Sequence, residues 1–137
     1  MYWQVIHSLP VHDSSLLSIH TDIPIEGNIT LHLSLEINEE EPVEPFLDIG
    51  IDSRRICLIF QNCWQITSNI LGFTTISGTI ISWDIVEPSP FAKRLNQVGF
   101  TKALSLVHHK FGFSSGSTLE ILAETCAVET LISLNRT

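Results

Sequence analysis

A chain of 137 residues with a formal net charge of −8 is long enough for one domain with a buried core. Its apolar content of 44% and charged content of 16% exclude a disordered chain, and its acidity excludes a general affinity for nucleic acid. All seven basic residues follow residue 53, whereas ten of the fifteen acids precede it. We therefore expect a single domain over residues 1–137 with an acidic N-terminal part.

Groups that bind transition metals are concentrated in the first 32 residues. Imidazole and carboxylate together can hold zinc, and residues two apart on a strand share a face. His32 would join His20 and Asp22 if its strand pairs antiparallel through the turn region at residues 23–28. Exposed histidines beside an acidic edge are the alternative, because no HExxH or repeated H-x-H motif is present. The candidate metal ligands are His7, His12, His20, Asp22 and His32.

Period-two alternation predicts strands in this half of the chain. Residues 28–38, NITLHLSLEIN, place Leu31, Leu33 and Leu35 on one face and polar residues on the other. Residues 46–52, FLDIGID, alternate in the same way and predict another strand. The inward residues of that strand are Leu47, Ile49 and Ile51.

Residues 38–45, NEEEPVEP, combine charge with two prolines and predict a loop between these strands. Its carboxylates would attract a basic surface and accelerate encounter, with a strong dependence on salt. A solvated edge that maintains solubility is the alternative. The predicted partner-binding residues are Glu39, Glu40, Glu41 and Glu44.

Residues 56–83 contain no charge and are numerous enough to span a bilayer. Polar side chains interrupt the segment, and each would be costly in hydrocarbon. Its Ile, Thr, Phe and Trp residues are typical of strands, so we expect two buried strands, a turn and no membrane span. The predicted core comprises Leu31, Leu33, Leu35, Leu58, Phe60, Ile81, Trp83, Phe91 and Leu95.

One short helix is predicted at about residues 90–98, with Ser89 as N-cap, Pro90 in the first position and Gly99 as the stop. Strand composition returns in residues 102–113. Residues 117–132 fit either a second helix near the C-terminus or two strands turning at residues 124–126, and we favour the strands. The predicted fold class is α+β, mostly antiparallel β-sheet.

His108 and His109 are the only adjacent histidines. Consecutive side chains of a strand point to opposite faces, so the pair cannot bind one ion. His109 shares an apolar face with Val107 and Phe111, and we expect it to be the more buried, with His108 nearer solvent. The sequence thus predicts two structural histidines and no metal at this position.

The three cysteines, Cys57, Cys63 and Cys126, form no closed disulfide set and no zinc motif. The first residues, MYWQVIHSLP, lack the basic start and apolar run of a signal peptide. We therefore expect a cytoplasmic protein with buried thiols.

The segments CLIFQNCW, ISWDIVEPSPFAKRL, LSLVHHKF and LEILAE, within residues 56–125, resemble those of a large set of small bacterial proteins. Some of these are suspected immunity proteins of bacterial competition systems. The resemblance implies a sheet-rich domain with one helix and a binding role. It is carried by Trp83, Val86 (one place later than in the pattern), Ser89, Phe91, His108 or His109, and Glu120.

Three classes of function follow from these features. The first is a non-catalytic acidic binding protein that neutralises a basic protein partner. The second is a structural or assembly subunit that forms a homodimer, because the mean hydropathy of +0.25 leaves apolar surface to cover. The third is a small metal-dependent enzyme that uses the N-terminal histidines. The first is favoured, with no catalytic residue, no cofactor, no nucleic acid and no membrane.

Overall fold

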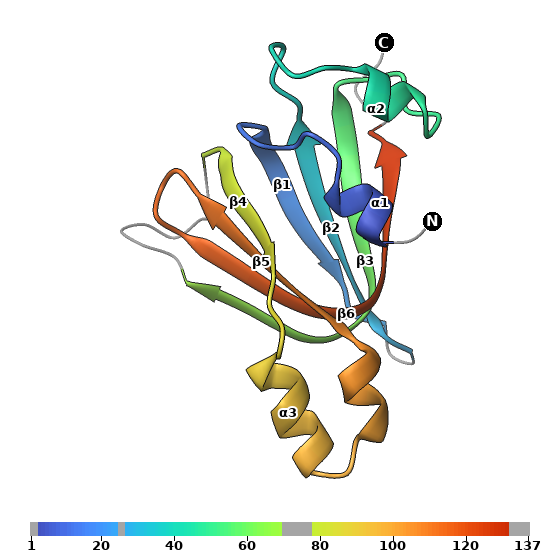
Figure 1. The fold of residues 1–137 in the computed structure, drawn as a ribbon, viewed down its shortest axis with the longest axis vertical. Helices are drawn as coiled ribbons and strands as arrows, with labels where there is room; N and C mark the ends of the chain where they lie inside the picture. Colours follow the sequence, from blue (N-terminus) through green and yellow to red (C-terminus); the bar gives the residue numbers. More distant parts are fainter. Residues whose placement is uncertain (1–2, 25–26, 70–77, 132–137) are drawn as a thin grey trace.

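The computed structural model describes residues 3–24, 27–69 and 78–131. Figure 1 shows a curved six-stranded antiparallel sheet with short helices around it, which confirms the predicted α+β fold. The elements are α1 (Trp3–His7), β1 (Ser15–Asp22), β2 (Ile29–Glu36), α2 (Glu44–Leu47), β3 (Arg55–Asn69), β4 (Ile80–Ile85), α3 (Pro90–Gln97), the 3₁₀ helix η1 (Thr101–Ser105), β5 (Val107–Phe113) and β6 (Thr118–Thr130).

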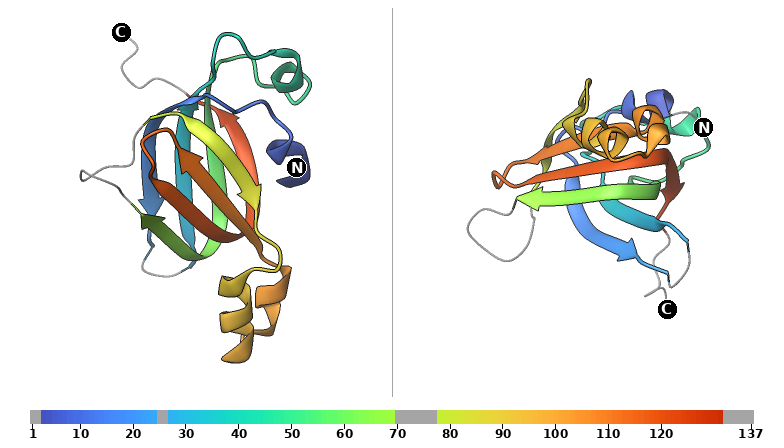
Figure 2. Two further views of the ribbon diagram at one scale, coloured as in Figure 1. Left: turned by 60° about the vertical axis from the view of Figure 1, so that its left-hand side comes forward. Right: turned by 90° about the horizontal axis from the view of Figure 1, so that it is seen from below.

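The strands lie in the order β1-β2-β3-β6-β5-β4, so β1 and β4 form the two edges. These edges approach each other at one end of the sheet. There the Asp13 N–H donates to the Ile80 carbonyl at 2.8 Å, and the Ile80 N–H donates to the Ser14 carbonyl at 3.0 Å. The sheet therefore curls, as the view from below in Figure 2 shows.

The main core lies on the inner face of this curved sheet, where alternate residues of the strands meet α1. Leu31, Leu33 and Leu35 are fully buried there, as the alternation of residues 28–38 predicts. Burying such apolar side chains is the main force that stabilises the fold. Other members of this core are Ile6, Ile56, Leu58, Phe60, Ile80, Phe111, Phe113, Leu119 and Ile121.

A smaller cluster covers the outer face, where α3 and η1 form a helical hairpin. It joins Phe91, Ala92 and Ala103 to Leu122 of β6. Leu122 follows Ile121 of the main core, so the two side chains point to opposite faces. The hairpin extends beyond the end of the sheet in Figure 1.

The predicted helix is confirmed as α3. The Ser89 hydroxyl accepts a hydrogen bond from the Ala92 N–H at 3.1 Å, which is the expected N-cap. Pro90 occupies the first turn, where its missing N–H costs nothing. Gly99 has a φ of 102°, the left-handed conformation that ends a helix.

The prediction that Ile81 belongs to the core is wrong, because this side chain is 51% exposed. A register shift between Ile80 and Ser82 adds a residue to β4. Ile80 and Trp83 consequently both face the core, with Ile80 buried and Trp83 half-buried. Strict alternation along the sequence could not anticipate this bulge.

The strand predicted for residues 46–52 is also wrong. Pro45 lies in the first turn of the short helix α2, and Gly50 reverses the chain with a φ of 84°. Phe46 and Ile51 are buried, whereas Leu47 is 53% exposed. The apolar residues of this segment therefore follow a helical turn rather than a strand.

Neither alternative for residues 117–132 is fully right. Residues Thr118–Thr130 form one continuous strand, β6, which pairs with β3 from Ile56 to Asn69. A second helix and a turn at residues 124–126 are both wrong for this segment. The long partner strand β3 supplies hydrogen bonds throughout, so β6 runs on without a turn.

No helix within the described residues is long and apolar enough to cross a membrane. The uncharged segment 56–83 instead contributes β3 and β4, as predicted. The turn predicted between them lies outside the described residues.

Candidate functional site

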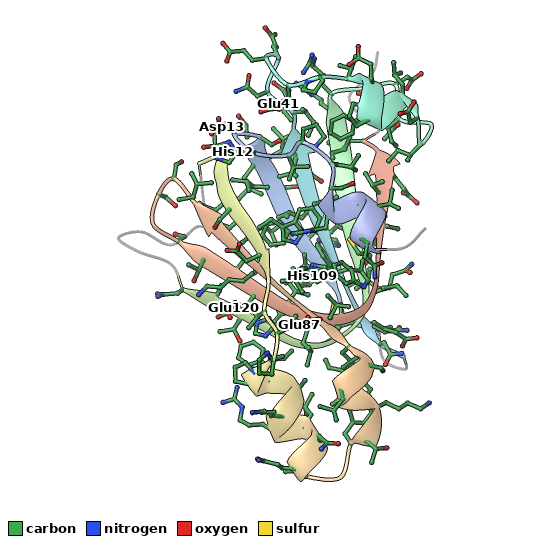
Figure 3. The ribbon with its side chains drawn as sticks, viewed as in Figure 1. His12, Asp13, Glu41, Glu87, His109 and Glu120 are labelled. Atoms are coloured by element: carbon green, nitrogen blue, oxygen red, sulfur yellow. The ribbon has the colours of Figure 1, made fainter. Side chains whose placement is uncertain are left out.

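The acidic loop and α2 form one end of the molecule, which we call the acidic pole. In Figure 3 Glu41 lies at this end, far from Glu120. Within the described residues none of these carboxylates forms an ion pair, so their charge faces solvent. The acids of the pole are Glu39, Glu40, Glu41, Glu44, Asp48 and Asp52.

Arg54 fixes the backbone of the acidic pole without neutralising its carboxylates. Its guanidinium donates to the carbonyls of Asn38 at 2.5 Å, Glu39 at 3.0 Å and Glu41 at 3.3 Å. The side chains of the loop therefore stand on an ordered backbone, although the stretch has no regular structure. An ordered loop loses less entropy on binding than a disordered one.

A pocket of about 210 Å³ opens between α2 and the segment that follows it, within the acidic pole. Its walls are mostly apolar, and Leu47 and Val43 are partly exposed at it. Asp52 and Arg54 stand at the same pocket. The lining residues are Ile37, Val43, Phe46, Leu47, Ile51, Asp52, Ser53 and Arg54.

The structure brings together three of the five candidate metal ligands. His20 pairs with His32 across β1 and β2, the antiparallel register that the prediction required. The Asp22 carboxylate accepts from His20 Nε2 at 2.9 Å and from His32 Nε2 at 3.3 Å. The hydrogen bond from His20 lowers the pKa of the exposed Asp22.

The other two candidates lie elsewhere. His7 donates to the Trp83 carbonyl at 2.7 Å, and His12 contacts Asp13 at 3.1 Å. Among the described residues no group of three or more ligands is arranged to hold a metal ion. The metal site thus stays a prediction without a coordination geometry.

His109 lies on the inner face of β5, within an aromatic cluster. The Trp83 indole N–H donates to His109 Nδ1 at 3.0 Å, and the Phe60 ring centroid lies 4.9 Å away. Burial, with smaller effects of His7 and His108, lowers the pKa of His109 to about 3. His109 is therefore a neutral core histidine, as the sequence predicts.

His108 points to the outer face, but the expectation that it lies nearer solvent is wrong. Its side chain is fully buried because α3 covers it. The Phe91 ring stacks on the imidazole with centroids 4.3 Å apart and planes inclined by 18°. A strand pattern alone could not show that a helix would pack over this face.

Both nitrogens of His108 have partners, and we call this set the His108 network. Nε2 lies 3.0 Å from Glu120 Oε1, and Nδ1 lies 2.8 Å from Ser89 Oγ. A carboxylate can only accept, so Nε2 carries the proton and Nδ1 accepts from the Ser89 hydroxyl. Burial lowers the pKa of His108, although Glu120 acts against this shift. The ring is therefore neutral, in one tautomer, and hydrogen-bonded to a serine.

A pocket of about 440 Å³ adjoins the His108 network at the base of the hairpin. Ser89 and His108 line it, together with Lys93. Val86, Leu104 and Leu106 contribute apolar walls. The network thus borders a space large enough for a small organic group.

The cysteines are unpaired and buried, which agrees with the expectation of core thiols. Cys57 Sγ lies 3.8 Å from His32 Nδ1, but burial raises the pKa of this thiol. Burial also raises the pKa of Cys63 to about 11 and of Cys126 to about 12. None of these thiols is activated as a nucleophile, because the thiolate is the reactive form and a raised pKa disfavours it.

No family model matches the chain, and neither a curated protein nor a solved structure matches it. The resemblance to small bacterial proteins therefore remains a prediction. The sequence did contain a signal for the His108 network, since Ser89, Phe91, His108 and Glu120 all belong to the segments quoted for that resemblance. The sequence alone does not show the pairing of β5 with β6 that brings His108 and Glu120 together.

Proposed function

We propose that the protein binds a basic protein partner through the acidic pole and neutralises that partner by covering its surface. The observation that supports this proposal is an apolar pocket built by residues 37–54, a segment that carries all six carboxylates of the pole and places Asp52 at the pocket itself. An exposed pocket with an apolar centre and a charged rim resembles the general anatomy of protein interfaces. The His108 network has no part in this function.

The two components of the pole have different physical roles. The carboxylates raise the rate of encounter with a cationic surface, and salt weakens this effect. The pocket receives one apolar side chain of the partner, and burying such a side chain contributes about 1.5–3 kcal/mol. The charge of the pole thus selects a basic segment, and the pocket selects an apolar anchor within it.

A synthetic lysine-rich peptide with one central leucine tests this proposal by fluorescence anisotropy. We expect the double variant Glu39→Gln/Glu40→Gln to bind it roughly two- to thirtyfold more weakly at low salt, because two charge pairs are lost and each exposed pair contributes about 0.2–1 kcal/mol. A peptide with serine in place of the leucine should also bind more weakly.

The matched control is the double variant Asp84→Asn/Glu87→Gln, which removes two exposed carboxylates outside the pole. It should bind the peptide as the native protein does. Equal losses in both double variants would show that only net charge matters, and the proposed binding surface would be wrong.

Homodimer formation is a second candidate, which the edge of β1 beyond Leu16 favours, because the backbone contacts to the start of β4 lie at residues 13–16. Leu17 on this strand is 44% exposed, and Ile23 just beyond it is 72% exposed. An edge strand with apolar side chains is a template for pairing with another chain. Light scattering should then give about 31 kDa, twice the chain mass of 15.3 kDa.

The variant Leu17→Lys should dissociate such a dimer, whereas Leu104→Lys, on the helical hairpin, should not. A monomer at high concentration for the native protein would contradict this candidate. We also propose a cytoplasmic location, because unpaired buried cysteines are typical of reducing compartments.

A further inference from the structure

Three side chains of the His108 network have the connectivity of a nucleophile, a base and an orienting carboxylate. A hydrogen bond of 2.8 Å joins Ser89 Oγ to His108 Nδ1, and one of 3.0 Å joins His108 Nε2 to Glu120 Oε1. Such sets are recognised by their geometry and roles rather than by sequence order. We propose that Ser89 is a nucleophile for acyl transfer, with His108 as its general base.

The surroundings hold the base in a single orientation. Phe91 stacks on one face of the imidazole, and Glu120 accepts the Nε2 proton. Nδ1 is therefore free of a proton and directed at the Ser89 hydroxyl. A base that is already oriented needs no reorganisation when the proton moves.

The N-terminus of α3 supports negative charge on the serine oxygen. The Ala92 N–H donates to Ser89 Oγ at 3.1 Å, and the aligned peptide dipoles of α3 point their positive end toward the same atom. Both interactions strengthen as Oγ loses its proton. They stabilise the helix in the resting protein and the oxyanion of Ser89 during attack.

The adjoining pocket defines the substrate class. Val86, Leu104 and Leu106 suit a short apolar acyl chain, and Lys93 brings a positive charge to the same space. An ammonium group there can stabilise the oxyanion of a tetrahedral intermediate. The fitting substrate is a small carboxylic ester.

The proposed reaction has two steps, acylation of Ser89 and hydrolysis of the acyl-serine. Ser89 Oγ forms a bond to the ester carbonyl carbon while His108 Nδ1 accepts the hydroxyl proton. The bond to the alkoxy group then breaks, and that proton passes from Nδ1 to the leaving alcohol. Water, activated by His108, cleaves the acyl-serine in the same manner and releases a carboxylic acid.

An alkyl fluorophosphonate tests the nucleophile directly, since attack by Ser89 forms an O–P bond and releases fluoride. We expect one adduct per chain, located at Ser89 by peptide mass spectrometry. We also expect slow hydrolysis of a p-nitrophenyl butyrate probe. No adduct, or an adduct only at other residues, would overturn the proposal.

The variant Ser89→Asn separates catalysis from helix capping, because asparagine caps a helix as well as serine does. It should fold as the native protein does and lose both the adduct and the hydrolysis. Ser105→Ala is the matched control, since this exposed serine of the same hairpin only donates to the Lys102 carbonyl. It should leave both signals unchanged. Hydrolysis that persists in Ser89→Asn would contradict the assignment. An adduct on a residue other than Ser89 in the native protein would contradict it as well.

Glu120→Gln tests the positioning role of the carboxylate. Labelling should slow by at least about tenfold, in line with the typical contribution of an oriented base. Its pH midpoint should also move downward, because Glu120 raises the pKa of His108 against burial and the nearby Lys110. An unchanged rate and pH midpoint would show that Glu120 only supports the fold.

Discussion

The acidic pole and the His108 network are opposite kinds of site in one small protein (Figure 3). The pole takes its charges from one contiguous stretch, residues 39–52, and leaves them in solvent. The network takes Ser89, His108 and Glu120 from three elements and buries the imidazole completely. The first kind of site gives long-range attraction that salt screens, whereas the second gives fixed geometry that depends on the whole fold.

The largest expected difference between a buried and an exposed region concerns a pair of leucines. Leu33→Ala in the inner core should lower the free energy of unfolding by about 2–5 kcal/mol, because it leaves a cavity. Leu47→Ala at the acidic pole, where the side chain is 53% exposed, should cost less than about 1 kcal/mol. Urea denaturation of both variants measures the two values. Equal costs would mean that the faces are assigned wrongly.

The next effect concerns the pH dependence of stability, which the buried His109 controls. Burial holds the pKa of His109 at about 3, whereas an unfolded histidine titrates near 6.5. The unfolded state therefore binds more protons between these values, and stability falls as the pH decreases through this window. His109 alone should contribute roughly 1 kcal/mol per pH unit there.

His109→Gln should reduce this slope, because the variant no longer titrates at that position. Ser105→Ala, at an exposed serine that does not titrate, should leave the slope as it is in the native protein. Free energies of unfolding from urea titrations between pH 4 and 7 provide the comparison. Identical slopes in all three proteins would contradict the burial of a neutral His109.

A smaller effect is expected at the N-cap that links the network to α3. Ser89→Ala should cost about 1 kcal/mol, because the Ala92 N–H loses its acceptor. Ser89→Asn should cost only a few tenths of a kcal/mol. Thermal unfolding followed by circular dichroism distinguishes the two. A neutral Ser89→Ala variant would show that the cap does not stabilise the fold.

The parts of the fold that depend on local signals could be predicted from the sequence. The alternation of residues 28–38, the cap at Ser89 and the stop at Gly99 each require only neighbouring residues. The bulge that exposes Ile81 could not be predicted, because its position depends on pairing with β5. The helix α2 was missed because Pro45 and Gly50 outweigh an apparent alternation.

The same distinction holds for the candidate sites. The acids of the pole are neighbours in the sequence, so their proximity follows from the sequence alone. The pocket does not follow from the sequence, because the alternation of residues 46–52 predicts a strand where α2 forms. The opposite faces of His108 and His109 follow from strand geometry, but the burial of His108 depends on a helix from another segment.

The proposed function requires that the acidic pole, and no other surface, receives an apolar anchor from a basic partner. Methyl chemical-shift mapping with the lysine-rich, leucine-containing peptide tests it most directly. We expect the largest shifts at Ile37, Val43 and Leu47, with smaller shifts as salt increases. Shifts centred on Val98 or Leu104 of the hairpin, or shifts spread evenly over the surface, would contradict it.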